Sequence, residues 1–145
     1  LPDAQIGLPN EVEAIGAAVW ERDFVMLCPE QTPLIPPASM DCAINSSSFQ
    51  EMTYPLITTF FELIRRCLRD GGLFYCLNEA SCSTHPDGST IEFDRYPWGE
   101  DFEDLFYEQS EYWRALGERP RMHRLQRKRV KRHGKAEQVE TALTV

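Results

Sequence analysis

Residues 41–78 place two short apolar runs on either side of a long amphipathic segment. Residues 41–45 read Asp-Cys-Ala-Ile-Asn, and residues 73–77 read Leu-Phe-Tyr-Cys-Leu. The segment between them repeats its apolar side chains at the spacing of a helix, at Ile57, Phe60, Phe61, Ile64, Cys67 and Leu68. A strand, a helix and a second strand in so short a stretch predict a βαβ unit with parallel strands.

The limits of this unit also follow from its residues. Pro55 is tolerated only in the first turn of a helix, so the helix begins near Thr53 or Tyr54. The pair Gly71-Gly72 predicts where the helix stops. Because both strand segments are short and apolar, we expect each to be buried on both faces of a parallel sheet.

The same alternation extends toward the N-terminus. Asn10 followed by Glu13 has the spacing of a helix cap, and residues 11–20 then predict an amphipathic helix. Residues 24–28 are wholly apolar, which favours another strand buried on both faces. Prolines make residues 30–40 an extended loop. The predicted fold class is α/β, with an open doubly wound sheet.

The pattern changes after residue 80. Residues 91–93 predict a weak strand, and residues 100–116 predict one or two packed helices because aromatic and acidic side chains alternate in groups. Residues 122–125 predict a final strand. We therefore expect one domain over residues 1–130, followed by a flexible basic and polar tail over residues 131–145.

Composition narrows the class of protein. The 145 residues are 42% hydrophobic and 26% charged, which suits one globular domain. No apolar run approaches the roughly 18 residues that span a bilayer, so we expect no membrane partner. The five cysteines form no CxxC pair and lie partly in apolar runs, which favours free thiols in a reducing, cytoplasmic setting. Since the chain opens on Leu1, we expect a piece of a longer protein.

Charge is distributed unevenly along the chain. Residues 1–118 hold 21 acidic and six basic side chains, whereas residues 119–135 hold nine basic side chains and no acidic one. A basic stretch can bind nucleic acid, but the acidic remainder would repel phosphate and the stretch lacks aromatic side chains for base stacking. We expect instead that it forms a partly exposed strand whose cations meet the acidic residues before it. Nucleic acid is not an expected partner.

Ligands of open α/β sheets bind at the carboxyl ends of the strands. Here each predicted strand is followed by polar residues, which are Pro29, Glu30 and Gln31, then residues 45–51, then residues 78–81. Glu51 could accept a proton from a substrate hydroxyl. The spacing of Ser48 and Glu51 also fits a capping box, and both interpretations stay open. His85, His123 and His133 lack spaced ligand partners, so no metal site is expected.

Two strings carry a resemblance to a known family. The string Ser48-Phe-Gln-Glu-Met52 after a strand, and Gly71-Gly-Leu-Phe-Tyr-Cys-Leu-Asn78 after a helix, resemble motifs of the sugar O-methyltransferases. That family belongs to the class I S-adenosylmethionine-dependent methyltransferases. The resemblance implies a Rossmann-like sheet ending in an antiparallel hairpin, with residues 24–28, 41–45, 73–77, 91–93 and 122–125 as strands 3 to 7. The glycine-rich cofactor loop of the family is absent, so the chain resembles its carboxyl-terminal portion.

The resemblance also implies a site and a reaction. The cofactor would be S-adenosylmethionine, bound by Pro29, Glu30, Gln31, Asn45 and Ser46. Glu51 and Gln50 would be catalytic, and a sugar or glycan would contact Ser47, Phe49, Asn78, Tyr96 and Trp98. The alternative is a non-catalytic α/β interaction module derived from a methyltransferase fold, and a homo-oligomer is left open.

Overall fold

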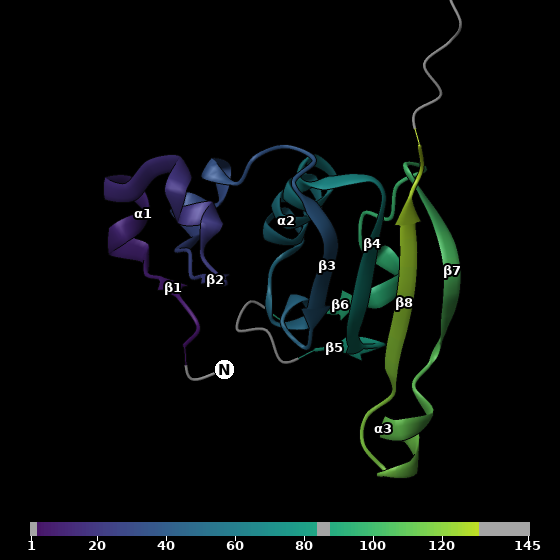
Figure 1. Ribbon diagram of the computed structural model, residues 1–145. Coiled ribbons are helices and arrows are strands. Elements are labelled where there is room, and N and C mark those ends of the chain that lie inside the picture. Colours follow the sequence, from purple (N-terminus) through teal and green to yellow (C-terminus); the bar gives the residue numbers. More distant parts are fainter. Residues whose placement is uncertain (1–2, 84–87, 131–145) are drawn as a thin grey trace, which may run out of the picture.

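A four-stranded mixed sheet organises the chain. The computed structural model describes residues 3–83 and 88–130. The sheet contains β3 (Met40–Ser46), β4 (Leu68–Glu79), β7 (Phe102–Gln109) and β8 (Arg121–Lys128), in the spatial order β3-β4-β8-β7 (Figure 1). β3 and β4 are parallel, whereas β8 is antiparallel to both β4 and β7. This confirms the α/β class and a terminal antiparallel hairpin. The hairpin is β7 with β8, however, so the assignment of residues 91–93 to it is wrong, and residues 24–28 contribute no strand to this sheet.

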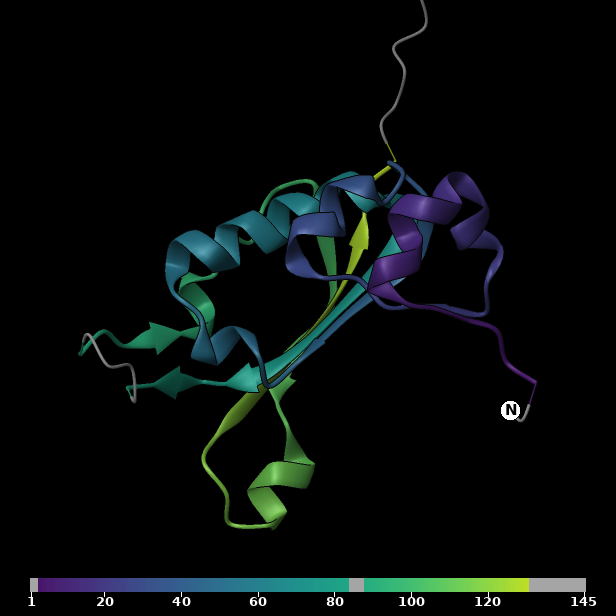
Figure 2. The same cartoon turned by 90° about the vertical axis from the view of Figure 1, so that its left-hand side faces the viewer.

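Helix α2 (Tyr54–Cys67) connects the two parallel strands and covers one face of the sheet (Figure 2). It begins where predicted, with Pro55 in its first turn. Its apolar stripe packs on the sheet in a core that is mostly aromatic. Phe61 stands at the centre of that core, 5.5 Å from Phe49, 5.4 Å from Phe74 and 5.0 Å from Trp98 between ring centroids.

The Gly71-Gly72 pair was predicted to end the helix, but it lies inside β4. Helix α2 stops at Cys67, and Leu68 is already extended. Leu68 pairs with Met40 and Leu73 with Cys42, so β4 carries a bulge opposite β3. Gly71 has φ +78°, and a Cβ on Gly72 would lie 2.9 Å from the carbonyl oxygen of Arg69. Glycines are therefore needed here by the bulge.

Burial of the predicted strands on both faces is wrong for the first two. β3 is an edge strand whose side chains alternate, with Ala43 against the core and Ile44 73% exposed. β2 (Phe24–Val25) has only two residues and pairs in parallel with β1 (Ile6–Gly7), leaving Phe24 51% exposed. A strand is buried on both faces only when layers cover both, and among the described elements α2 covers one.

The N-terminal helix begins earlier than predicted. It comprises α1 (Pro9–Ile15) followed by the 3-10 helix η1 (Gly16–Glu21). Asn10 therefore lies inside the first turn, and the Glu11 carboxylate accepts a hydrogen bond of 2.9 Å from the Leu8 amide. The predicted loop over residues 30–40 instead contains the 3-10 helix η2 (Pro29–Leu34).

The region after residue 90 differs most from prediction. β6 (Ile91–Glu92) pairs with β5 (Ser81–Cys82) outside the main sheet, and the 3-10 helix η4 (Phe93–Arg95) follows. The predicted helical region over residues 100–116 is β7 and the short helix α3 (Glu111–Ala115). A bulge between Asp104 and Phe106 breaks the alternation that marks a strand in sequence.

Ion pairs across the hairpin join the acidic segment to the basic one. Arg124 approaches Asp104 at 2.5 Å, and Arg127 approaches Glu103 at 3.3 Å. The expectation that the basic stretch meets the acidic residues before it is confirmed for these two arginines. The predicted tail, residues 131–145, lies outside the described residues. Within the described ranges, no helix combines the length and apolar character needed to cross a membrane.

Candidate functional site

The carboxyl ends of β3 and β4 lie side by side, since Ser46 pairs with Leu77. The 3-10 helix η3 (Phe49–Glu51) follows β3 directly, and α3 and the start of β8 lie toward the same end of the sheet, at the bottom of Figure 1. The polar segments predicted after the second and third strands are therefore brought together at one edge.

A buried amide network joins the two strand ends. Asn78 is fully buried, and its Nδ2 donates to Asn45 Oδ1 at 2.9 Å. Asn78 Oδ1 accepts from the backbone N–H of Gln50 at 3.2 Å, and Asn45 Nδ2 donates to Ser48 Oγ at 2.5 Å. Buried amides joined in this way hold the loop after β3 against the end of β4. Asn78 thus has a structural position, away from any surface that a substrate could touch.

Gln50 and Glu51 occupy different environments. Gln50 is 6% exposed, and its Oε1 accepts a 2.7 Å hydrogen bond from the Glu79 amide. It holds η3 in position, and a substrate could not reach its side chain without a rearrangement. Glu51 is exposed, and no side-chain hydrogen bond caps η3 from Ser48. The capping-box interpretation is therefore wrong, and Glu51 has a free path to a ligand.

Ser47 adopts a backbone conformation that few residues with a side chain adopt. Its φ is +57°, and its amide donates to the Leu77 carbonyl oxygen at 2.8 Å. Such conformations persist where the surroundings over-determine them, and they are enriched at binding sites. The Ser47 hydroxyl accepts a hydrogen bond from Arg121 Nη1, which ties β8 to the loop after β3.

Arg121 was not predicted from sequence. Its guanidinium carbon lies 4.2 Å from the centroid of the Trp113 ring, and its Nε is buried without a hydrogen-bond partner among the described residues. It pairs with Glu79 in the strand register, at the end of β4. Its partner Ser47 is 74 residues away in sequence, so no local pattern could have singled it out.

Three aromatic residues predicted to contact substrate lie in or against the core. Phe49 is 2% and Tyr96 3% exposed, and their rings are 5.9 Å apart. Burial raises the pKa of the Tyr96 hydroxyl. Trp98 is partly buried and donates from Nε1 to the Phe93 carbonyl oxygen at 2.9 Å. The prediction that Phe49, Tyr96 and Trp98 line a glycan site is therefore not supported, because the core uses their faces.

Pro29, Glu30 and Gln31 do not join this edge. They begin η2, whose Thr32 carbonyl accepts a hydrogen bond from Arg66 in the last turn of α2. The loop after β3 instead leads into the first turn of α2, and a 14-residue helix is about 20 Å long. The side chain of Gln31 is occupied locally, by the Cys28 amide and the Pro9 carbonyl.

No strongly nucleophilic or metal-binding group emerges at the edge. Burial raises the pKa of the Cys76 thiol to about 12, although a hydrogen bond with Asn78 partly opposes the shift. Cys76 therefore stays a neutral thiol at neutral pH. Within residues 3–83 and 88–130, no three His, Cys, Asp or Glu side chains are placed to hold a metal ion.

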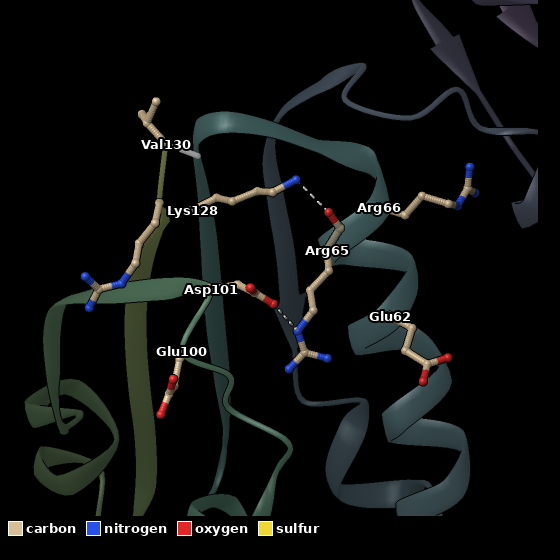
Figure 3. Close-up of a pocket in the computed structure, with 8 residues that line it drawn as sticks. Glu62, Arg65, Arg66, Glu100, Asp101, Lys128 and Val130 are labelled. Carbon is tan, nitrogen blue, oxygen red and sulfur yellow. Dashed lines mark hydrogen bonds and ion pairs between the residues drawn. The ribbon is translucent and has the colours of Figure 1, made fainter. Parts of the chain in front are cut away.

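A pocket of about 460 Å³ lies elsewhere, at the carboxyl-terminal end of α2 (Figure 3). Its cations already have partners. Lys128 donates to the carbonyl oxygens of Arg65 and Leu68 at 2.7 and 2.6 Å, and Arg65 approaches Asp101 at 3.6 Å. These contacts satisfy carbonyl groups at the end of the helix, so they explain the charged lining without a ligand.

Comparison with known proteins supports the fold. No protein-family description and no curated protein matches the chain by sequence. A Sulfolobus solfataricus protein described as a type 11 methyltransferase is 16% identical, with a TM-score of 0.52 over 90% of this chain and 74% of its own. The Burkholderia thailandensis 1,6-didemethyltoxoflavin-N1-methyltransferase, solved with 1,6-didemethyltoxoflavin and S-adenosylhomocysteine, is 16% identical with a TM-score of 0.57, over 86% of this chain and 61% of its own.

The cyclase SpnF is also similar, at 15% identity and a TM-score of 0.55, over 86% of this chain and 66% of its own. The chain thus spans less than two thirds of the length of these last two proteins. The likeness establishes a methyltransferase-type Rossmann-like fold. Because a cyclase shares it, the fold alone does not fix the chemistry.

Proposed function

We propose that this chain is part of an S-adenosylmethionine-dependent methyltransferase that acts on a sugar hydroxyl. The observation that supports methyl transfer is the likeness in fold to two proteins described as methyltransferases, with TM-scores of 0.52 and 0.57. The polar edge formed by β3 and β4 lies where ligands of such sheets bind. The sugar as acceptor rests on the resemblance of residues 41–78 to the sugar O-methyltransferases.

The fit of the cofactor differs between the two predicted segments. Ser46 is exposed at the end of β3, and Asn45 beside it is held in place by its amide contacts. These two residues suit contact with a polar ligand. Pro29, Glu30 and Gln31 do not, since they lie toward the other end of α2. When bound, S-adenosylmethionine supplies an electrophilic methyl group on a sulfonium.

Glu51 is the residue we propose to act on the acceptor. Its exposed carboxylate can accept the proton of a hydroxyl, or orient that hydroxyl for attack. Gln50 is assigned a positioning role, since its side chain holds η3 to the Glu79 amide. Much of the rate would come from alignment of the two reactants, which a loop fixed by buried amides favours.

The first test is calorimetric titration of the protein with S-adenosylhomocysteine. We expect a micromolar dissociation constant that is weakened by Ser46→Tyr, which fills the edge. Glu30→Gln should leave the constant unchanged, because Glu30 is exposed on η2. Absence of binding to the protein would count against the cofactor assignment.

The role of Glu51 has its own test. Glu51→Gln should lower turnover about 100-fold or more if the carboxylate is a general base, with little change in affinity for S-adenosylhomocysteine. Glu62→Gln is the matched control, because Glu62 is an exposed glutamate on α2. Unchanged turnover in Glu51→Gln would exclude this role.

A non-catalytic interaction module is the second candidate function. The observation that favours it is the exposure of apolar side chains on three strands, with Ile6 at 50%, Phe24 at 51% and Ile44 at 73%. Exposed apolar strand edges are suited to pairing with another chain. Sedimentation velocity separates the candidates, since the module predicts concentration-dependent association without any affinity for S-adenosylhomocysteine.

A further inference from the structure

Arg121 differs from Arg119, Arg124 and Arg127 in having no acidic partner among the described residues. Arg119 pairs with Glu79 at 3.3 Å, Arg124 with Asp104 at 2.5 Å and Arg127 with Glu103 at 3.3 Å. Arg121 instead contacts a hydroxyl and an aromatic ring. Its positive charge is therefore not neutralised by a described side chain, although it lies at the polar edge formed by β3 and β4.

Two contacts fix the Arg121 guanidinium before any ligand arrives. Nη1 donates to the Ser47 hydroxyl, in a loop whose φ of +57° is itself held by the Leu77 carbonyl. The Trp113 ring covers the group at 4.2 Å. The Ser47 contact limits the conformational freedom of the guanidinium with or without the ring, which favours recognition of a planar or tetrahedral oxyanion.

The remaining donors of Arg121 are the ones suited to an anion. Nε is buried and has no partner in the described part of the chain. Nε and the adjacent Nη2 form a fork that matches two oxygens of a carboxylate or phosphate. A buried donor without a partner is rare in folded proteins, and a ligand group is one explanation for it.

We propose that Arg121 binds an oxyanion carried by the acceptor, so that the preferred substrate is a sugar acid or a sugar phosphate. This rests on the proposed function and narrows its substrate class. Because Nε is buried in the free protein, an anion reaches it only when a neighbouring side chain moves, and Trp113, which contacts the guanidinium, is the side chain whose movement we test. Trp113 is half-buried on α3, a five-residue helix with no buried residues, and its ring contacts Tyr112 and Arg121.

The test is titration of the ¹⁵N-labelled full chain with sodium phosphate and, separately, with sodium acetate. We expect millimolar concentrations of at least one anion to shift the Arg121 Nε–H and Trp113 indole resonances together. Arg121→Gln should abolish the Trp113 shift, and Trp113→Phe should keep the fold and preserve the Arg121 shift. Arg127→Gln, on the same strand and paired with Glu103, should leave both shifts intact.

Each result has a defined meaning. A response to phosphate alone assigns a phosphate ester, and a response to acetate alone assigns a carboxylate. The proposal is overturned if neither anion shifts the Arg121 resonance, or if the Trp113 shift persists in Arg121→Gln. Failure of the proposed function gives a different result: the protein would not bind S-adenosylhomocysteine, but the Arg121 and Trp113 resonances would still shift with the anion.

Turnover provides a second readout once an acceptor is in hand. Arg121→Gln should raise KM for an acidic acceptor about 10- to 100-fold, the usual range for one charged hydrogen-bonded contact, with a smaller change in kcat. Arg121→Lys keeps the charge but loses the fork, so it should recover only part of the loss. An equal rise in KM for a neutral sugar would contradict recognition of the anion.

Discussion

Replacing Asn78 by alanine should destabilise the protein strongly, because Asn78 joins both strand ends from a fully buried position. The substitution removes the 3.2 Å hydrogen bond from the backbone N–H of Gln50 and the 2.9 Å hydrogen bond to Asn45 Oδ1. Each unsatisfied buried group costs about 1–3 kcal/mol, so for the two groups we expect a loss of about 2–6 kcal/mol in the free energy of unfolding. Small domains have only about 5–15 kcal/mol in total.

Asn78→Asp makes the same argument dependent on pH. The carboxyl group can still accept from the Gln50 amide, but when ionised it would face Asn45 Oδ1 without a proton to donate. Burial would raise its folded-state pKa above the unfolded value of about 3.9. The variant should therefore be close to wild type below about pH 4 and lose stability as the pH rises through the folded-state pKa.

Urea unfolding followed by circular dichroism measures both effects. Asn10→Ala is the control, because Asn10 is exposed in the first turn of α1, and we expect a change within about 0.5 kcal/mol. The reasoning is refuted if Asn78→Ala costs less than that control range. It is also refuted if the deficit of Asn78→Asp, relative to wild type, is the same at pH 4 and pH 8.

Two further predictions concern the core and the thiols. Phe61→Ala should cost about 3–5 kcal/mol in the free energy of unfolding by urea, because a large ring at the centre of the aromatic core is lost. The control Leu105→Ala, at an exposed bulge, should cost far less. Similar costs for the two variants would contradict the assigned core. A thiol-labelling assay on the native protein should modify Cys28 and Cys42, which are exposed. It should modify the buried thiols only on unfolding, and these are Cys67, Cys76 and Cys82. Fast native labelling of Cys76 would contradict its raised pKa and burial.

Sequence was sufficient where the signal was local. The stripe of α2, including Ile57 and Phe61, follows the helical period, and both side chains are buried as that period requires. The parallel pairing of β3 and β4 follows from the short connection through one helix. These features depend only on residues close together in the chain.

Features that depend on distant residues were missed. β7 was predicted as helix. Its acidic side chains find their partners on β8, and Asp104 meets Arg124 only after the hairpin forms, so no nearby residue indicates the pairing. The exposure of Ile44 depends on which strands and helices surround β3. Likewise, nothing near Gln50 in sequence shows that Glu79 occupies its side chain.

The position of β8 has a consequence for how the chain acquires its structure. β8 is the last described strand in sequence, yet it lies in the middle of the sheet between β4 and β7. During synthesis, β3, α2 and β4 leave the ribosome well before β8, the strand that pairs with the second edge of β4. One edge of β4 therefore stays unpaired until residues 121–128 emerge, and pairing across such separations is slow. We therefore expect the chain to be most prone to chaperone binding and to misassembly in the interval before β8 pairs with β4.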